Sequence, residues 1–443
     1  MKQRYRIDGR FVVADEEGFN QALAKAQASK TPVFCGCSSG VDLRLYISKR
    51  FGKLVLSRWP GSGGNHATGC DHFDAPDFLS GMGQVRGAAV VDDEMTGETS
   101  LKVNFPMSRG PARAAPSALT NDKPSVKSTG YKLSMRGLLH VLWDRAELTH
   151  WHPKMADKRN WYVVRRALLE AVEQCRMKTL PLAGLIFVPE SFREDDKAEI
   201  VKRRTMALER VRRSREEMMI VIAEVKERKA FEDRLRIVFK HVGDMRFVLD
   251  PDMAKRFNKR FEGDLNLWAS DDLRESHLIL AGSFCRRPEG TYDLIEVALM
   301  PVTRQWLPYE SSEELELIEK AVREKRRFVK GLRVNLERTV PIASLVLKDM
   351  GERAVAVHIH DEKIEAGEAL AALLDEQSVD HYLWWEGEDL PKRGERGPQG
   401  AGSAASAKPP VAGGPQRDQE KAAEENVPGD AQASRGFAAY ADG

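Results

Sequence analysis

The sequence predicts a multidomain α+β protein, and three observations lead to this fold class. The 443 residues are about three domains' worth of chain, and 42% apolar content is enough for several packed cores. Apolar residues follow β-like alternation near the N-terminus, then helical spacing, then short β-branched runs between helices. Three cysteines lie near two histidines in the first hundred residues, at spacings typical of a metal site.

Composition excludes some protein classes. Lys and Arg number 69 against 67 Asp and Glu, so the formal net charge is only +2 and no global field attracts nucleic acid or membrane. The mean hydropathy is -0.45, and no apolar run approaches the ~20 residues of a spanning helix. The N-terminus lacks the apolar segment of an export signal. We therefore expect a cytoplasmic protein, whose five cysteines are metal ligands or buried thiols.

Changes in composition divide the chain into six parts. A stretch rich in proline, serine and alanine predicts a linker, and the C-terminal residues include too few large apolar side chains to offset chain entropy. The expected parts are an N-terminal segment at 1–30, a zinc-binding β-hairpin module at 31–107, a linker at 108–132, a helical region at 133–234, an α/β domain at 235–388 and a disordered tail at 389–443.

The N-terminal segment is predicted to contain a short strand near Arg10–Ala14 and a helix at Glu17–Gln27. In the next module, Val41–Lys49 and Lys53–Trp59 alternate apolar and polar side chains on either side of a turn at 50–52. This pattern predicts a β-hairpin. Because a two-stranded hairpin alone is marginally stable in water, we expect a further element to hold it.

We predict that a structural zinc ion holds the hairpin. Cys35 and Cys37 are separated by one glycine, and Cys70 follows the hairpin. Three thiolates and one imidazole form a closed tetrahedral zinc site. The imidazole belongs either to His66 or to His72, and the second choice is similar to the SWIM zinc pattern. The alternative is a set of free cysteines beside exposed histidines. Two other cysteines stand alone in apolar patterns and are predicted to be buried thiols: Cys175 and Cys285.

The helical region begins with a helix capped by Ser134, and a second helix is predicted from about Lys158 to Cys175. Arg165 and Arg166 fall outside the apolar stripe of the second helix and form a local basic surface. Two such helices fit a helix-turn-helix unit that approaches DNA phosphates. They fit a helical bundle with a solvated face equally well.

A longer helix is predicted from about Asp195 to Lys229, and its first half is strongly basic. Several phosphate contacts along one helix would give salt-dependent binding to nucleic acid. The alternative is a charged helix that pairs its own side chains or packs on a partner. The basic residues are Lys202, Arg203, Arg204, Arg210, Arg212, Arg213 and Arg215.

The α/β domain has an order of helices and strands that is similar to the central part of the restriction-endonuclease-like fold. Such nucleases hold a divalent ion through carboxylates on two central strands. Those carboxylates are missing from the strands expected at 342–348 and 354–360. The remaining weak catalytic candidates lie on or just after these strands: Asp349, His358 and Glu362. We therefore expect no defined reaction, and a degenerate nuclease if there is one.

The chain resembles an uncharacterised bacterial domain-of-unknown-function family, number eleven-seventy-three, which is often encoded on plasmids and integrative elements. The resemblance covers most of the chain from Cys35 to about Asp349. It implies three N-terminal cysteines with a histidine at the position of His66, which favours His66 over His72. It implies no reaction. The resemblance rests on Cys35-Gly36-Cys37, Arg58-Trp59-Pro60-Gly61 to His66 and Cys70, Gly137-Leu138-Leu139-His140 with Leu142-Trp143, Lys158-Arg159-Asn160-Trp161, Trp306-Leu307-Pro308-Tyr309-Glu310 and Phe328-Val329-Lys330-Gly331-Leu332-Arg333.

Together these observations predict a zinc-binding, DNA-associated accessory protein of a bacterial mobile element, with nucleic acid as its partner. Two alternatives remain. One is a metal-dependent nuclease, and the other is a scaffold that binds another protein through Trp384-Trp385 or the long helix.

Overall fold

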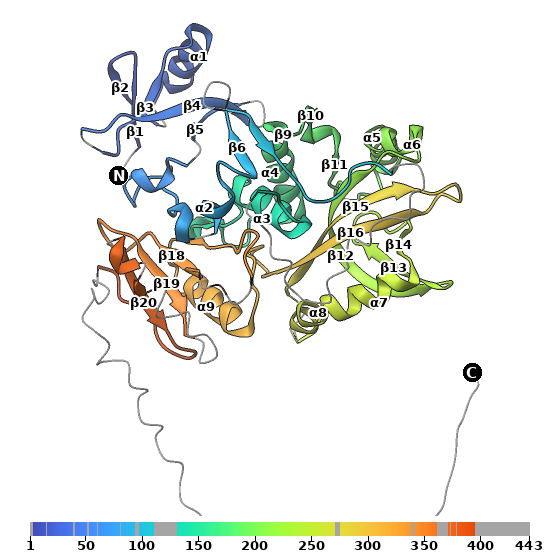
Figure 1. The fold of residues 1–443 in the computed structure, drawn as a ribbon. Coiled ribbons are helices and arrows are strands. Elements are labelled where there is room, and N and C mark those ends of the chain that lie inside the picture. The colour runs from blue at the N-terminus through green and yellow to red at the C-terminus, as the bar shows by residue number, and fades with distance from the viewer. Residues whose placement is uncertain are drawn as a thin grey trace, which may run out of the picture. The chain divides into compact units, whose positions relative to one another are not determined.

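The computed structural model describes residues 3–394 except 15, 39, 51–52, 60, 80, 94–96, 110–130, 271–274, 338–339, 341, 361–370, 373 and 378. The chain divides into two units, residues 1–400 and 401–443. Nearly all of the predicted linker and tail therefore lie outside the described residues. No described helix is long and apolar enough to cross a membrane. The described strands form four sheets, which Figure 1 shows with their helices.

The N-terminal sheet is antiparallel and has the order β2-β1-β3-β4-β5. Helix α1 (Phe19–Ser29) contributes Leu23 and Ala26 to the core on one face of this sheet. The predicted hairpin is confirmed as the β4–β5 pair, but it is not isolated, because β3 and β1 continue the sheet. Its strands are β1 (Arg4–Ile7), β2 (Arg10–Val13), β3 (Val33–Cys35), β4 (Leu43–Arg50) and β5 (Lys53–Arg58).

A small second sheet, of order β10-β9-β7-β6, combines two strands that follow the N-terminal sheet in the sequence with two that come after the central helices. The connecting segments contain short helices. The strands are β6 (Val90–Asp92), β7 (Thr99–Leu101), β9 (Cys175–Met177) and β10 (Leu180–Pro181), and the short helices are η1 (Gly63–Asn65), η2 (Asp77–Leu79), α2 (Met82–Val85), η3 (Pro153–Met155) and η4 (Leu182–Gly184).

The two predicted helices of the middle region are α3 (Met135–Arg145) and α4 (Trp161–Glu173). Ser134 caps α3 by accepting from the Gly137 N–H, as predicted, and Asn160 caps α4. Cys175 belongs to β9 and not to α4. Residues 146–160 separate the helices and contain β8 (His150–Trp151), whereas a helix-turn-helix joins its helices by a short turn.

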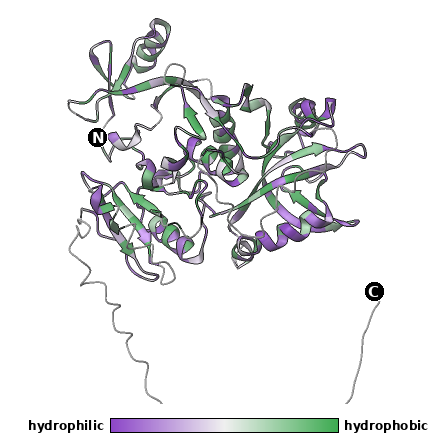
Figure 2. Cartoon of the chain, in the orientation of Figure 1, coloured by the Kyte–Doolittle hydropathy of each residue, from purple (hydrophilic) through white to green (hydrophobic). Residues whose placement is uncertain are grey.

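The six-stranded sheet has the order β11-β12-β13-β14-β16-β15, with β12 also paired to β15. Helix α3 packs on β15 and β16, and α7 (Pro251–Arg260) and α8 (Glu262–Ala269) contribute to the other core of this sheet. Its long strands are largely hydrophobic (Figure 2). The strands are β11 (Ile186–Phe187), β12 (Met219–Phe231), β13 (Arg234–Phe239), β14 (Phe247–Leu249), β15 (His277–Arg286) and β16 (Tyr292–Val302).

The prediction of one helix from Asp195 to Lys229 is wrong over most of the second half of this range. The chain forms α5 (Lys197–Ala207) and α6 (Glu209–Arg213) and then the 13-residue strand β12. Ile220 and Ile222 face one core, while Val221 and Ala223 face the other. A strand that is buried on both faces has a continuous apolar run, which periodicity alone does not distinguish from a buried helix.

The C-terminal sheet has the order β20-β19-β18-β17-β8, with β19 and β20 parallel and the other pairs antiparallel. The strands expected near 342–348, 354–360 and 381–385 are present, and the helix expected at 363–374 lies largely outside the described residues. Strand β8 joins this sheet across the boundary predicted at 234. The new elements are α9 (Ser312–Arg323), β17 (Phe328–Lys330), β18 (Leu345–Leu347), β19 (Val355–Ile359) and β20 (Asp380–Trp384).

Candidate metal centre

Two of the predicted metal ligands lie at the end of β3. Cys35 is the last residue of the strand and is buried, and Cys37 follows one glycine later. The Gly36 N–H donates to the Arg4 carbonyl oxygen at 2.8 Å. A Cβ atom on Gly36 would lie 2.9 Å from that same oxygen, so only glycine fits this close approach. The glycine thus allows the chain to turn beside β1 and present both sulfur atoms.

The other two ligands lie in a compact loop after β5. Gly63 packs so closely on Asp74 that a Cβ atom there would lie 2.2 Å from the Asp74 Cβ, and the Asp74 N–H donates to the Gly63 carbonyl. His66 has an extended backbone, and the Cys70 N–H donates to the Ala67 carbonyl at 2.8 Å. His66 and Cys70 are therefore joined by a turn, and not by the helical turn that their spacing suggests.

Cys35, Cys37, His66 and Cys70 come together in one cluster, in which one potential ligand atom from each lies within 4.8 Å of the others. The sulfur atoms of Cys35 and Cys70 are 3.6 Å apart. The His66 Nδ1 atom lies 3.4 Å from the Cys37 sulfur and 3.8 Å from the Cys70 sulfur. Tetrahedral zinc with ordinary bond lengths separates two sulfurs by ~3.8 Å and sulfur from nitrogen by ~3.6 Å. These three separations are close to those around a tetrahedral metal ion, and the cluster could hold one.

His72 lies beside the cluster but is directed elsewhere. Its Nε2 atom is 3.2 Å from the Tyr5 hydroxyl, and its ring centroid is 5.7 Å from that of His66. Its backbone N–H instead donates to the Cys70 sulfur at 3.4 Å. Of the two histidines that the sequence leaves open, the structure places His66 in the four-residue cluster.

Backbone N–H groups point at all three sulfurs. The N–H of Cys37 donates to Cys35, that of Ala67 to Cys37 and that of His72 to Cys70. Such N–H···S bonds are typical of the surroundings that stabilise metal-bound thiolates. Hydrogen bonds from Cys35 and His66 lower the pKa of Cys70 to about 3, although burial opposes this shift. The hydrogen bond with Cys70 and burial raise the pKa of Cys35, and burial raises that of Cys37.

The loop after β5 that carries His66 and Cys70, which we call the cysteine loop, also contacts the C-terminal sheet. The Lys348 ammonium lies 3.4 Å from the Cys70 carbonyl and 3.2 Å from the Phe73 carbonyl, and Thr68 donates to the Gly351 carbonyl at 2.8 Å. The Phe73 ring packs in a core with Val329 and other apolar residues of that sheet. Burial lowers the pKa of Lys348 to about 8. A metal at the cysteines would therefore fix a loop that connects two sheets.

The other two cysteines are solitary and fully buried, as predicted. The Cys175 thiol donates to the Ala171 carbonyl at 3.2 Å, and burial raises its pKa. Burial also raises the pKa of Cys285.

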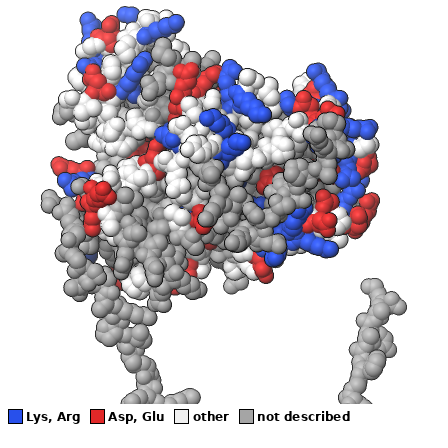
Figure 3. All heavy atoms as spheres, viewed as in Figure 1, with Lys and Arg blue, Asp and Glu red and all other residues white. Residues whose placement is uncertain are grey.

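Most of the basic residues predicted to meet nucleic acid form contacts within the chain. Arg165 donates to the Val188 carbonyl, and Arg166 is half-buried on α4. Lys202 and Arg212 are exposed. On the face shown in Figure 3, positive and negative side chains are interspersed. Ion pairs join Arg203 to Glu190, Arg204 to Asp244, Arg210 to Glu217 and Arg213 to Glu209.

The candidate catalytic residues of the α/β domain form no metal cluster with other described residues. Asp349 accepts from Arg326 and Arg393, each at 3.1 Å, and these arginines keep its pKa below the usual range although burial opposes the shift. His358 is buried, and burial lowers its pKa to about 4. Glu362 lies outside the described residues. An open divalent-ion site is therefore not assembled from Asp349 and His358.

Trp384 cannot serve as the docking residue of a scaffold, because it is fully buried and its indole N–H donates to the Glu388 carbonyl at 2.9 Å. Its neighbour Trp385 stacks on His360 with ring centroids 3.6 Å apart.

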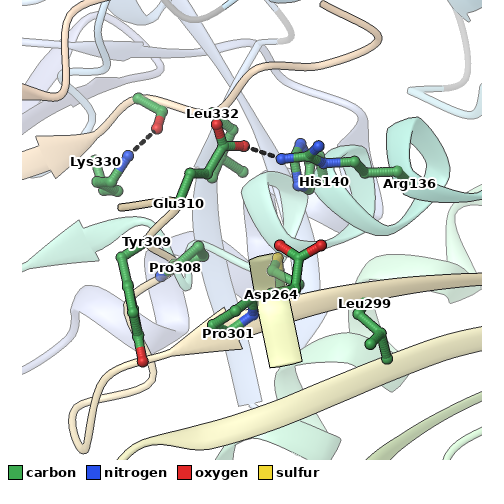
Figure 4. A pocket seen from close by; sticks show the side chains of 12 residues that line it. Arg136, His140, Asp264, Leu299, Pro301, Pro308, Tyr309, Glu310, Lys330 and Leu332 are labelled. Carbon is green, nitrogen blue, oxygen red and sulfur yellow. Dashed lines mark hydrogen bonds and ion pairs between the residues drawn. The ribbon is translucent and has the colours of Figure 1, made fainter. Parts of the chain in front are cut away.

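A small pocket, with room for about one water molecule, lies between α3, α8 and the ends of β16 and β17 (Figure 4). Its charged side chains are paired. Glu310 accepts from Arg333 at 2.7 Å and pairs with Arg136, and these cations keep the pKa of Glu310 far below its usual range despite burial. Lys330 pairs with Glu314 at 2.8 Å. Glu310, Lys330 and Arg333 belong to the motifs at 306–310 and 328–333, but nothing in their sequence spacing indicates that they form this cluster.

Comparison with known proteins gives one match. A family model described as a protein of unknown function matches residues 5–387, which include all four residues of the cysteine–histidine cluster. No curated protein and no solved structure matches the chain.

Proposed function

The chain belongs to the DUF1173 family of proteins of unknown function, so its role has to be inferred from its own chemistry, and we propose that it binds one structural zinc ion through Cys35, Cys37, His66 and Cys70. The observation that carries the proposal is the set of separations between sulfur and nitrogen atoms, which match those around tetrahedral zinc.

The donor set favours zinc over other metals. Three thiolates and an imidazole are soft and borderline ligands, which exclude magnesium and calcium and suit zinc. All four positions are supplied by the protein, and three of the four side chains are buried. A closed, four-ligand site is typical of structural zinc and leaves no position for a substrate or a catalytic water.

The proposed role of the ion is to fasten the cysteine loop to β3. Because that loop also contacts Lys348 and Gly351, the ion would stabilise the N-terminal sheet and its contact with the C-terminal sheet together. Zinc contributes on the order of 10 kcal/mol to small domains that fold around it. The five-stranded sheet and α1 add hydrophobic burial of their own, so the ion is one of two sources of stability here.

The proposal does not extend to duplex DNA or to cleavage. Four arginines of the basic run are already paired with carboxylates, and Asp349 is paired with Arg326 and Arg393. Arg204, Arg210 and Asp349 are partly buried in these pairs. Arg203 and Arg213 are exposed, and their pairs alone do not argue against a phosphate.

Elemental analysis of the purified full-length protein tests the proposal. We expect about one zinc per chain, and loss of that zinc in the Cys35→Ser variant, because a hydroxyl does not replace a thiolate ligand. Cys175→Ser is the matched control, since this thiol is buried far along the chain from the cluster. Metal-free wild-type protein, or iron in place of zinc, would contradict the proposal.

A further inference from the structure

The two faces of the N-terminal sheet differ. Tyr5, Ile7, Val33, Cys35 and Leu45 point into the core that α1 covers. Because side chains alternate along a strand, the residues between them point to the opposite face. On that outer face Arg6, Phe34 and Arg44 are exposed or half-buried, whereas Ser48 and Ser57, farther along it, are buried.

The outer face carries a row of alternating aromatic and arginine side chains. Arg6 is the cross-strand partner of Phe11 on one side and of Phe34 on the other, and Phe34 is the partner of Arg44. Phe11, Arg6, Phe34 and Arg44 therefore lie side by side on the neighbouring strands β2, β1, β3 and β4, in that order. The row ends at Trp59, whose ring lies 5.0 Å from the Arg44 guanidinium carbon. We call Phe11, Arg6, Phe34, Arg44 and Trp59 the aromatic–arginine row.

Cation–π contacts join arginines to the rings of the row. The Arg6 guanidinium carbon lies 4.7 Å from the Phe34 ring centroid, and that of Arg4 lies 5.7 Å from the Phe11 ring centroid. Cation–π contacts of this kind orient the guanidinium planes and rings without removing the charge. Phe11 is 63% exposed, and Arg4 and Arg44 are exposed as well. The row is therefore distinguished by its alternation of rings with arginines, and not by the exposure of any single ring, which is common on protein surfaces.

We propose that the aromatic–arginine row binds single-stranded nucleic acid. Bases of an unpaired strand stack on aromatic rings and on guanidinium planes, while arginines contact the phosphates between them. Phe11 and Phe34 lie on the strands at either side of β1, which places their backbones ~10 Å apart with Arg6 on the strand between them. An extended strand can set two bases on these rings and a phosphate near the intervening cation. A duplex buries its base faces in the stack and offers nothing to the rings.

A carboxylate contacts the row. Asp42, which is 67% exposed, pairs with Arg6. An exposed ion pair of this kind is weak, so a phosphate can compete for the arginine. An acidic peptide would match the arginines alone, whereas the alternation of rings with cations matches a polymer that alternates bases with phosphates.

The row and the metal centre lie on opposite faces of the same end of β3, and the two proposals are independent. Phe34 is adjacent to Cys35, and the Phe11 ring is so near Gly36 that a Cβ atom there would lie 3.2 Å from it. Zinc would therefore fix the end of β3 on which the row is built. Binding by the row does not depend on the identity of the metal, so each proposal can fail without the other.

Fluorescence anisotropy with a labelled oligothymidylate of about 16 nucleotides tests the inference on the full-length protein. We expect saturable binding that weakens between about 50 and 200 mM salt, and weaker binding to a duplex of the same length. Phe11→Ala should reduce the affinity about fivefold or more, because one stacking contact is lost. Arg44→Ala should lower the slope of log affinity against log salt by ~0.7, the value for one phosphate contact with a single strand.

Two control variants keep the test selective. Phe192→Ala removes a ring that is 48% exposed but lies outside the N-terminal sheet, and its affinity should equal that of the wild type. Asp42→Asn removes the competing carboxylate and should strengthen binding. Thermal unfolding of each variant checks that the fold is intact, which is expected for exposed positions such as Phe11.

Three results would overturn the inference. They are no binding at the lowest salt, unchanged affinity in a folded Phe11→Ala variant, and displacement of the oligonucleotide by polyglutamate as readily as by unlabelled oligothymidylate. The last result would show a general surface for polyanions, with an acidic protein as its partner.

Discussion

Single side chains decide the identity of the metal centre. Spacing predicts Cys35, Cys37 and Cys70 but leaves His66 and His72 open, because both lie within four residues of Cys70, and the family resemblance alone favours His66. The choice depends on where each ring points. His72 is held by Tyr5, which is far away in sequence, and only the folded sheet brings Tyr5 to this position.

We expect His66→Ala to lose most of its zinc, because one of the four ligands is removed, and His72→Ala to retain it. The zinc content of the two variants, purified side by side, measures the difference. Retention of zinc by His66→Ala together with its loss from His72→Ala would show that His72, and not His66, is the fourth ligand.

His140 gives a prediction for pH. It is 1% exposed, and burial, with the nearby charge of Arg136, lowers its pKa to about 3. Between about pH 6.5 and pH 3 the unfolded chain takes up a proton that the folded chain does not, so folding is destabilised as the pH falls through this range. Relative to His140→Gln, the wild type should lose ~1.4 kcal/mol of unfolding free energy per pH unit below about pH 6.

Urea unfolding of both proteins at several pH values between these limits measures this difference. Loss of zinc in acid affects both proteins and cancels when they are compared. Equal slopes for wild type and His140→Gln would show that His140 takes up its proton in the folded state.

Elements were predictable where their apolar pattern had one interpretation. The β4–β5 hairpin, the Ser134 cap and the strands β13, β15 and β16 agree with the pattern. Strand β12 was not recognised, because it is buried on both faces and follows two basic helices. Helix α7 was also missed, although Asp250 caps it by accepting from the Met253 N–H and Pro251 occupies its first turn. That capping signal was available in the sequence.

The turn after β17 supplies a prediction at this scale. A Cβ atom on Gly331 would lie 2.0 Å from the Ala343 carbonyl oxygen, so Gly331→Ala must push β17 and the strand after it apart. We expect a loss of about 3 kcal/mol in the free energy of unfolding. Gly184→Ala is the matched control, because nothing lies within 4 Å of its Cβ position, and its effect should stay within about 0.5 kcal/mol. Chemical denaturation compares the two variants.

At the scale of the whole molecule, sequence and structure differ most in how the parts join. The sequence predicts consecutive modules, but β8 pairs with β17, and β11 and β12 belong to the same sheet as β15 and β16. Long-range pairings of this kind leave no local pattern, because each strand satisfies its alternation with any partner of suitable register. The family match over residues 5–387 spans all four sheets.

Removal of zinc should therefore act locally at first. After treatment with a chelator, hydrogen exchange should accelerate in β3 and in residues 61–79, which the ion fastens, while β15 and β16 remain protected in their own core. Mass spectrometry of exchanged peptides resolves these regions. Uniform acceleration across the chain would instead mean that the ion supports the fold as a whole, and no change anywhere would mean that it supports nothing.

Zinc K-edge X-ray absorption of the purified wild-type protein tests the central claim most directly, because it reports the atoms bound to the metal. Cys35, Cys37, His66 and Cys70 predict three sulfur neighbours at about 2.3 Å and one nitrogen at about 2.0 Å. A shell dominated by oxygen, or one with fewer than three sulfurs, would contradict the assignment of these four residues.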